Sequence, residues 1–160
     1  MIAVLHNIRS IHNVGSIFRT ADAVGIAKLF LCGITPAPID DYGRQRSALL
    51  KVSLGAEQSV YWESASSTLD VLMDLRTQGY ILCALEQAPS SISLYSYPFA
   101  VDILDRLAII VGNEIDGLPQ DVMQLADAIV HIPMYGNKES LNVSVAFGIC
   151  VYSILERTKK

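Results

Sequence analysis

Short apolar runs recur along this chain with helical patterns between them, and this alternation constrains the fold more than any other feature. Six runs predict β-strands, and several are apolar throughout, as in a parallel sheet that is covered on both faces. They lie at residues 2–5, 29–32, 59–62, 80–85, 107–111 and 128–132. Strands that alternate with helices form βαβ units, so the sequence predicts an α/β fold with a mostly parallel sheet and helices on both faces.

Helical spacing explains much of the sequence between these runs. The clearest helix contains the apolar positions of residues 14–24 and ends at Gly25. A second helix around residues 69–75 ends near Gly79, and Pro119 opens a third over residues 119–126. These stop and start signals are typical of helices that connect parallel strands.

The length and composition predict a single domain. With 160 residues the chain can bury a proper core, and we expect one domain over residues 1–160. It is 51% hydrophobic with a mean hydropathy of +0.37, so some apolar surface is expected to pack against a partner chain. No apolar run approaches the roughly 20 residues of a membrane span. The first residues, "MIAVLHNIRS", do not resemble a signal peptide, and we expect a cytoplasmic protein.

The cysteines and histidines do not predict a metal site. The cysteines stand far apart in apolar sequence, which favours buried free thiols over a disulfide. The histidines are equally scattered, and no metal constellation is expected. These residues are Cys32, Cys83, Cys150, His6, His12 and His131.

The charge is unevenly distributed along the chain. The net charge is −4, which by itself argues against a nucleic-acid partner. Residues 1–51 contain six Lys or Arg and three acids, a balance of +3, whereas the remainder contains six against thirteen, or −7. Such an asymmetry is typical of a basic face on an acidic body, and chance clustering explains it equally well.

Ligands of open parallel sheets bind beyond the carboxyl ends of the strands, so the loops at these ends are the first place to look for a site. The loops "HNVGSIFRTA", "EQAPS", "GNEIDGLP" and "PMYGNKES" follow four of the predicted strands. They contain neither a P-loop nor G-x-G-x-x-G, which disfavours a nucleoside triphosphate or a dinucleotide. Glycines at 112, 117 and 136 would still let the backbone approach a flat group such as adenosine.

The last predicted helix begins with a polar group that needs a partner. Residues 143–155 are apolar on nearly every face, as expected of a buried helix. Ser140 could cap this helix by accepting the amide of residue 142 or 143. Asn142 is left unexplained, because a buried amide requires hydrogen-bond partners.

Three segments carry a resemblance to a known family. "NVGSIFRTA" (13–21), "IIVGNEIDGLP" (109–119) and "IPMYGNKESLNVSVA" (132–146) resemble the three motifs of the SpoU/TrmH family of RNA ribose 2′-O-methyltransferases, and "KVSLGAE" (51–57) extends the match. The motifs occur in order and at suitable separations. The resemblance implies S-adenosylmethionine as methyl donor, a homodimer, and a deep C-terminal trefoil knot that forms the cofactor pocket. General rules of topology would have predicted an unknotted sheet.

The resemblance also assigns roles to individual residues. It implies a catalytic group of Asn13, Arg19, Glu114, Ser140 and Asn142, and cofactor contacts at Leu85, Gly112, Ile132, Ser140 and Leu141. The implied reaction requires no metal ion. Purely structural alternatives exist for three of these residues: a helix N-cap at Asn13, a solvated helical side chain at Arg19 and a carboxylate at a helix N-terminus at Glu114.

The implied reaction requires the enzyme to align the ribose with the methyl donor and to remove a proton from the ribose hydroxyl. A ribose hydroxyl must attack a methyl group on sulfonium in line, and the enzyme must help that hydroxyl to lose its proton. A guanidinium is hard to deprotonate. We therefore expect Arg19 to hold the adjacent phosphate and stabilise the developing alkoxide, while the proton leaves through Ser140 or water.

Two other classes of function remain. A non-catalytic module that binds RNA or S-adenosylmethionine is one alternative, and a Rossmann-type reductase, which shares the α/β pattern, is the other. Among RNA partners both transfer RNA and ribosomal RNA fit the family, and DNA is not expected. We expect no separate RNA-binding extension, which slightly favours a compact structured RNA such as transfer RNA.

Overall fold

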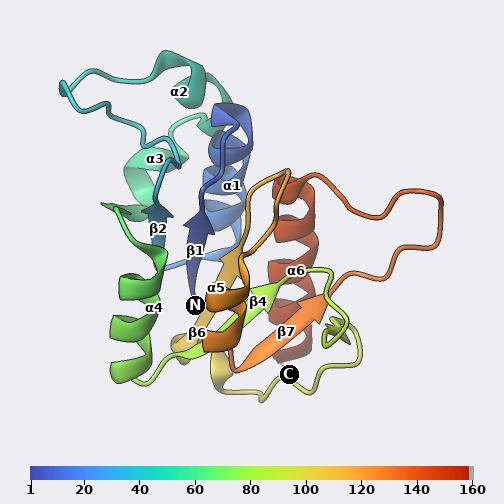
Figure 1. The fold of residues 1–160 in the computed structure, drawn as a ribbon. Helices are drawn as coiled ribbons and strands as arrows, with labels where there is room; N and C mark the ends of the chain where they lie inside the picture. The colour runs from blue at the N-terminus through green and yellow to red at the C-terminus, as the bar shows by residue number, and fades with distance from the viewer. Residues whose placement is uncertain (159–160) are drawn as a thin grey trace.

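Seven strands form one sheet within residues 1–158, the part of the chain that the computed structural model describes (Figure 1). The order is β3-β2-β1-β6-β4-β7-β5, and every neighbouring pair is parallel. Lys159 and Lys160, which contribute to the charge count above, lie outside the described residues. The strands are β1 (Ile2–His6), β2 (Lys28–Cys32), β3 (Tyr61–Ala65), β4 (Ile81–Leu85), β5 (Ile92–Ser93), β6 (Leu107–Val111) and β7 (Ala128–His131).

The centre of the sheet is apolar on both faces because helices cover both. Each residue of β6 is buried, in agreement with its unbroken apolar sequence. In β1 the side chains alternate: Ala3 and Leu5 pack in one core, and Ile2 and Val4 in the core on the opposite face. The predicted parallel α/β sheet with helices on both faces is therefore confirmed.

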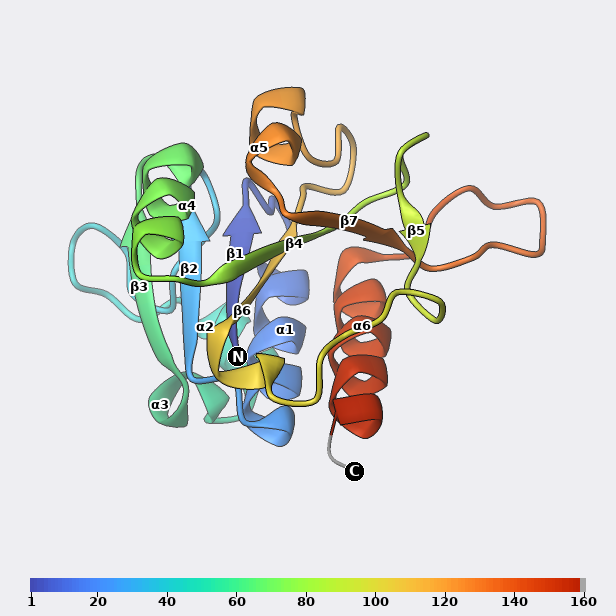
Figure 2. The ribbon, with the colours of Figure 1, turned by 90° about the horizontal axis from the view of Figure 1, so that it is seen from below.

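Figure 2 shows α1 and α6 on one face of the sheet, with α4 and α5 on the other. The short helices α2 and α3 pack beside α1. The bounds are α1 (Ile11–Val24), α2 (Ser47–Ser53), α3 (Ala56–Ser59), α4 (Thr68–Thr77), the 3-10 turn η1 (Ile103–Arg106), α5 (Gln120–Leu125) and α6 (Val143–Thr158). No helix among the described residues is both long and apolar enough to cross a membrane.

The predicted elements differ from the structure mainly around residues 47–65. All six predicted strands exist, but β3 begins at Tyr61 rather than at residue 59, because α3 still occupies the sequence up to Ser59 and the amide of Val60 donates to the carbonyl of Ala56 at 3.0 Å. The sequence analysis missed α2 and α3, since "KVSLGAE" has no clear helical period. It also missed the two-residue strand β5.

Helix α6 is less uniformly buried than its sequence predicts. Phe147, Val151 and Ile154 are buried, together with Cys150. Val145 and Tyr152, however, are 50% and 46% exposed in the single chain. One side of α6 thus presents apolar surface that this chain does not cover.

The three cysteines are free and buried, as the sequence predicted. Burial raises the pKa of the Cys83 thiol to about 12, so it stays protonated at neutral pH.

Candidate functional site

A cavity of about 380 Å³ opens where β4, β6 and β7 end. This is the carboxyl edge of the sheet, where open α/β folds bind ligands. The cavity is lined by residues from segments 85–87, 111–117, 131–134 and 140–146. Its volume falls within the range of roughly 300–1,000 Å³ that small-molecule sites occupy.

The sequence-predicted cofactor residues all lie around this one cavity. Its lining includes Leu85, Gly112, Ile132, Ser140 and Leu141. These residues come from three different strand ends and from the approach to α6. The fold therefore brings together positions that are far apart in the sequence.

Three of the predicted catalytic residues form a chain of hydrogen bonds at the edge of the cavity. The Nδ2 amide of Asn142 donates to Oδ1 of Asn13 at 3.0 Å. The Nδ2 amide of Asn13 in turn donates to Oε1 of Glu114 at 2.7 Å. Glu114 and Asn142 line the cavity, and the buried Asn13 joins them from α1. One residue from each of the three motifs thus meets in a single network.

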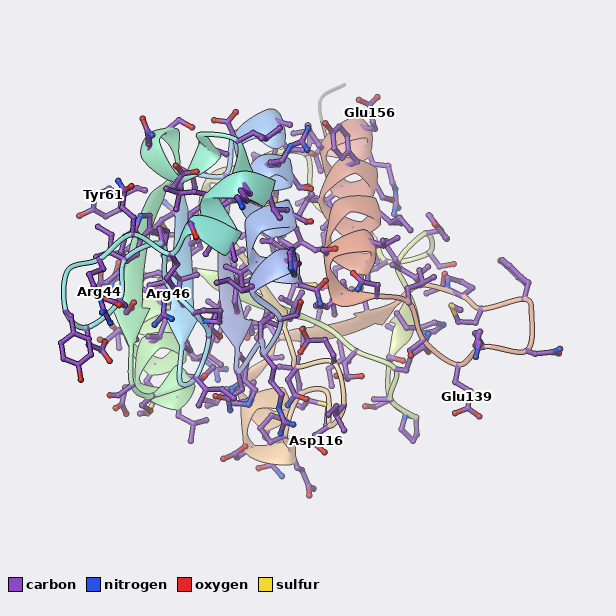
Figure 3. All side chains as sticks on the ribbon, turned by 90° about the horizontal axis from the view of Figure 1, so that it is seen from above. Arg44, Arg46, Tyr61, Asp116, Glu139 and Glu156 are labelled. Carbon is purple, nitrogen blue, oxygen red and sulfur yellow. The ribbon has the colours of Figure 1, made fainter. Side chains whose placement is uncertain are left out.

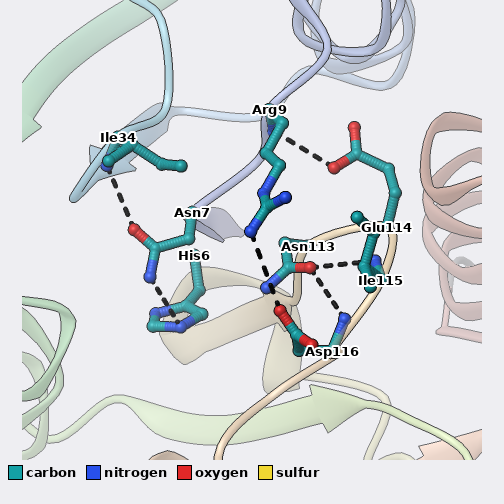
Figure 4. A network of polar contacts seen from close by, with 8 residues as sticks. All are labelled: His6, Asn7, Arg9, Ile34, Asn113, Glu114, Ile115 and Asp116. Carbon is teal, nitrogen blue, oxygen red and sulfur yellow. Dashed lines mark hydrogen bonds and ion pairs between the residues drawn. The ribbon is translucent and has the colours of Figure 1, made fainter.

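Glu114 is held at the start of α1 as an acceptor. Its two carboxylate oxygens accept the backbone N–H groups of Arg9 and Ser10, both at 3.1 Å. Figure 4 shows the contact with Arg9. Burial alone would raise the pKa of Glu114, but the hydrogen bonds from Arg9, Asn13 and Ser10 outweigh it and the pKa is lowered. The helix dipole also stabilises a carboxylate at a helix N-terminus. The helix is α1, however, and not the one that follows Glu114 in the sequence.

The loop after β6 is also held by hydrogen bonds within the loop itself. Figure 4 shows Asn113 accepting the amides of Ile115 and Asp116 through one side-chain oxygen, at 2.9 and 2.8 Å. Arg9 adds an ion pair with Asp116 at 3.9 Å, which is exposed and contributes little. The network shapes the loop that carries Glu114.

Gly112 is required for a different reason from the one expected. A Cβ at this position would lie 2.3 Å from the carbonyl carbon of Gly117 and 2.6 Å from the amide nitrogen of Leu118. The close approach is therefore between two backbone segments of the same loop. A side chain at Gly112, expected from the sequence to stand where the backbone approaches the ligand, would first displace the loop.

Asn142, rather than Ser140, caps α6. Its Oδ1 accepts the amide of Ser144 at 2.9 Å and the hydroxyl of Ser144 at 2.7 Å. Its Nδ2 donates to Asn13, so both ends of the amide are used. Ser140 is exposed, and within residues 1–158 its hydroxyl makes no hydrogen bond, which leaves it available at the cavity. The expected Ser140 cap was wrong because the helix starts only at Val143.

A profile of the SpoU rRNA methylase family matches residues 1–152. The chain belongs to this family.

Two relatives in the SpoU family show how far the similarity extends. The tRNA (guanosine(18)-2′-O)-methyltransferase of Aquifex aeolicus is 29% identical over 152 residues, which are 95% of this chain. The 23S rRNA (guanosine-2′-O-)-methyltransferase RlmB of Xanthomonas axonopodis pv. citri is 30% identical over 157 residues, or 98% of this chain. The chain spans 67% and 59% of the length of these two relatives.

A solved structure of similar size matches along almost its whole length. It is described as giving structural insights into the 2-OH methylation of C/U34 on tRNA. The two chains share 28% identity with a TM-score of 0.77, and the match covers 98% of this chain and 93% of the other. The two chains therefore share their fold over nearly their whole lengths.

Arg19 of the first SpoU motif lies outside the cavity of its own chain. It is exposed on α1 and lines a separate hollow between α1 and the α2–α3 connection, together with Asp22 and Leu54. A helix N-cap at Asn13 is also wrong, because α1 begins at Ile11 and Ser10 caps it. Within one chain the structure unites four of the five catalytic candidates at the cavity and separates Arg19 from them.

The sequence analysis missed two polar residues of the SpoU cavity. Oε2 of Glu86 accepts the amide of Leu118 at 2.7 Å, and Nε2 of Gln87 donates to the carbonyl of Ile132 at 2.9 Å. Both were part of the polar loop noted after the fourth strand, but nothing in that loop singled them out. They brace the two loops that face each other across the cavity. Among the described residues no group of three or more His, Cys, Asp or Glu side chains is placed to hold a metal ion.

Proposed function

We propose that this protein transfers a methyl group from S-adenosylmethionine to a ribose 2′-hydroxyl of RNA. The observation that carries the proposal is the single cavity around which the three family motifs converge, with the Asn142–Asn13–Glu114 hydrogen-bond chain at its edge. The same motifs define the family to which the chain belongs.

The cavity fits the proposed cofactor in size and lining. Leu85, Ile132 and Leu141 supply apolar surface for a flat adenine ring, and glycines at 112 and 117 leave backbone groups accessible. Solved structures of the fold include one titled as a complex with AdoMet, at 23% identity. When bound, the cofactor supplies an electrophilic methyl group on its sulfonium, and no metal is needed for that chemistry.

The chain's own residues would then align the ribose and remove its proton. The exposed Ser140 hydroxyl lies at the cavity and can relay the proton of the attacking hydroxyl to water. Asn13 and Glu114 hold Asn142 in one orientation beside it. Arg19 would bind the neighbouring phosphate and stabilise the developing alkoxide.

Arg19 must reach this cavity from a second copy of the chain. It lies on α1, outside the cavity of its own chain, and is exposed. The exposed apolar positions of α6, Val145 and Tyr152, offer a surface on which such a copy would pack. We propose a homodimer in which each active site combines one chain's cavity with the partner's Arg19.

The proposal includes a C-terminal trefoil knot. The segment after β4 hydrogen bonds with the end of β7, where the amide of Leu94 donates to the carbonyl of His131 at 2.8 Å. The same segment is held from its other side by Arg157 of α6, which donates to the carbonyls of Leu94 and Tyr97 at 2.8 and 2.9 Å. The connection from β7 to α6 passes this segment, and this path supports the proposal that the C-terminal part of the chain is threaded into a knot.

We favour transfer RNA as the substrate, acted on in the cytoplasm, with residues 1–160 sufficient for recognition. The support is the match over 93% of a chain described in terms of tRNA methylation. Ribosomal RNA remains the second candidate because relatives of both kinds align with nearly the whole chain.

Methyl transfer from radiolabelled S-adenosylmethionine tests the proposal. The purified protein is incubated with unmodified total transfer RNA, with ribosomal RNA, and with either RNA in the presence of a chelator. We expect label in transfer RNA, undiminished by the chelator. Cofactor binding without incorporation into any RNA would instead support the non-catalytic binding module.

A further inference from the structure

The loop between β2 and α2, residues 33–46, carries the most unusual surface outside the cavity. It leaves β2 at the carboxyl edge of the sheet and closes a short turn in which the amide of Asp40 donates to the carbonyl of Arg44 at 2.9 Å. The Asp40 carboxylate accepts the amides of Tyr42 and Arg44, both at 2.9 Å. Gly43, with a φ of 76°, makes the turn possible. Its shape is therefore set by internal hydrogen bonds.

This turn presents an aromatic ring and a guanidinium together. The ring of Tyr42 is 82% exposed. The guanidinium carbon of Arg44 lies 5.0 Å from the centre of that ring, while Nε of Arg44 donates to Asp40 at 2.9 Å. Asp40 thus holds Arg44 against the ring and fixes both groups. An exposed ring with a cation beside it is a platform on which an unpaired nucleobase can stack.

A second arginine of the loop has one N–H group without an acceptor. Nε of Arg46 is shielded from solvent and donates to no atom of the described residues. Its backbone is fixed, since the amide donates to the carbonyl of Pro38 at 2.8 Å. Figure 3 shows Arg44 and Arg46 on the same side of the molecule, away from Glu139. Arg46 is only partly buried, and the planar fork of its two terminal nitrogens is suited to an RNA phosphate.

The loop has little net charge of its own. Asp40 and Asp41 offset Arg44 and Arg46. General electrostatic attraction is therefore a weak basis for binding here, and ring stacking must provide most of the contact. A protein partner could also use such a ring, but the loop lies on the same edge of the sheet as the cavity, two strands away from β6 in the order β2-β1-β6.

We infer that residues 33–46 form an RNA-docking loop in which Tyr42 stacks on an unpaired nucleobase of the substrate and Arg46 binds a phosphate. The inference rests on the proposed function, because it assigns part of substrate recognition to a loop outside the cofactor cavity. It assigns Tyr42 and Arg46 no role in cofactor binding or in the chemical step.

Fluorescence anisotropy with a labelled, unmodified transfer RNA transcript tests the stacking contact. Tyr42→Ala is expected to weaken RNA binding about tenfold, and Tyr42→Phe to restore most of it, because the ring rather than the hydroxyl stacks. Tyr95→Ala is the matched control, since Tyr95 is 52% exposed in the loop after β5. It should bind RNA as the wild type does. Unfolding curves and S-adenosylmethionine affinity should be unchanged in all three variants.

The salt dependence of binding separates the two contacts. Arg46→Gln should lower the slope of log K against log salt by about one, whereas Tyr42→Ala should leave the slope unchanged. Wild-type affinity of Tyr42→Ala for the RNA would overturn the inference even if the protein methylates RNA. Tyr42-dependent binding without methylation would instead overturn the proposed function and leave the loop's role intact. A wild type that binds no RNA would contradict both.

Discussion

The side-chain amide of Asn13 donates to the carboxylate of Glu114 at 2.7 Å, although 101 residues separate them in the sequence. This bond joins the first motif, on α1, to the second, in the loop after β6. The other end of the Asn13 amide accepts from Asn142 in the third motif. Asn13 is therefore the residue through which the three motifs are aligned.

Replacing Glu114 by Gln should destabilise the protein by about 1 kcal/mol. The carboxylate accepts three N–H donors, from Arg9, Ser10 and Asn13, and an amide would present its own N–H₂ group to at least one of them. Because Glu114 is exposed, water can replace part of the lost hydrogen bonding, and the loss of stability stays modest. Urea unfolding at neutral pH measures the change. Glu139→Gln, in an exposed loop, is the control and should be neutral.

The pH dependence of stability should also change in the Glu114→Gln variant. Because the pKa of Glu114 is lowered from 4.5 in the folded state, its charged form is the one that stabilises the fold. That contribution is present above pH 4.5 and is lost as the pH falls through the lowered pKa. The wild type should therefore lose more stability between neutral pH and acid than the variant does. Equal losses would show that Glu114 is not held as a carboxylate.

Gly112→Ala should destabilise the fold by about 1–3 kcal/mol, because its Cβ would clash with the backbone of Gly117. Cofactor affinity should fall together with stability, since the displaced loop lines the cavity. Gly136→Ala is the matched control, because a Cβ there meets nothing within 4 Å. Thermal unfolding and calorimetry provide both measurements. Weakened cofactor binding in a fully stable Gly112→Ala variant would mean that the glycine serves the ligand directly.

Val145→Lys should separate the proposed dimer into monomers. Val145 is 50% exposed in the single chain, so a lysine there costs the monomer little, within about 0.5 kcal/mol. In a dimer packed through α6 the same lysine would bury a charge in an apolar interface. Sedimentation at micromolar concentration measures the result. A wild type that is already an active monomer would refute the dimer.

Arg19→Ala should reduce single-turnover methylation about a hundredfold, a loss on the order of 3 kcal/mol of transition-state stabilisation. Fold and cofactor affinity should persist, because Arg19 is exposed and lies outside the cavity. Arg19→Lys should rescue poorly, since lysine lacks the planar fork that binds phosphate. Near wild-type methylation by the alanine variant would remove Arg19 from the mechanism.

Mixed dimers test where Arg19 acts. A dimer that combines one Arg19→Ala chain with one Asn142→Ala chain keeps one intact cavity facing an intact Arg19 only if the arginine acts on the partner's cavity. We expect such mixtures to recover activity that neither variant has alone. If Arg19 served its own chain's cavity, both sites of the mixed dimer would carry a defect and no activity would return.

The sequence predicted the sheet well, because buried parallel strands leave a strong local signal, whereas the residues placed at the cavity came from the family resemblance. Unbroken apolar runs such as that of β6 identify buried parallel strands, and the loops at their ends must meet at one edge of the sheet. Helices α2 and α3 escaped prediction because they are short and their stability comes from packing beside α1 rather than from a helical period.

The hydrogen-bond partners could not be predicted from the sequence. Asn13 was explained as a possible helix cap, and Ser140 as another, because caps are local features that a sequence can suggest. The true partners of Asn13 lie 101 and 129 residues away and become neighbours only when β1, β6 and α6 are in place. The crowding at Gly112 could not be predicted from the sequence either, because it comes from the backbone of another glycine in the same folded loop, Gly117.

The position of the transferred methyl group is the most direct test of the account. Transfer RNA is incubated with the wild-type protein and S-adenosylmethionine carrying a labelled methyl group, digested to nucleosides, and analysed by mass spectrometry. We predict that the label is found on a ribose 2′-oxygen, and that it is nearly absent with Arg19→Ala. Label on a base, or efficient transfer by the Arg19→Ala variant, would contradict it.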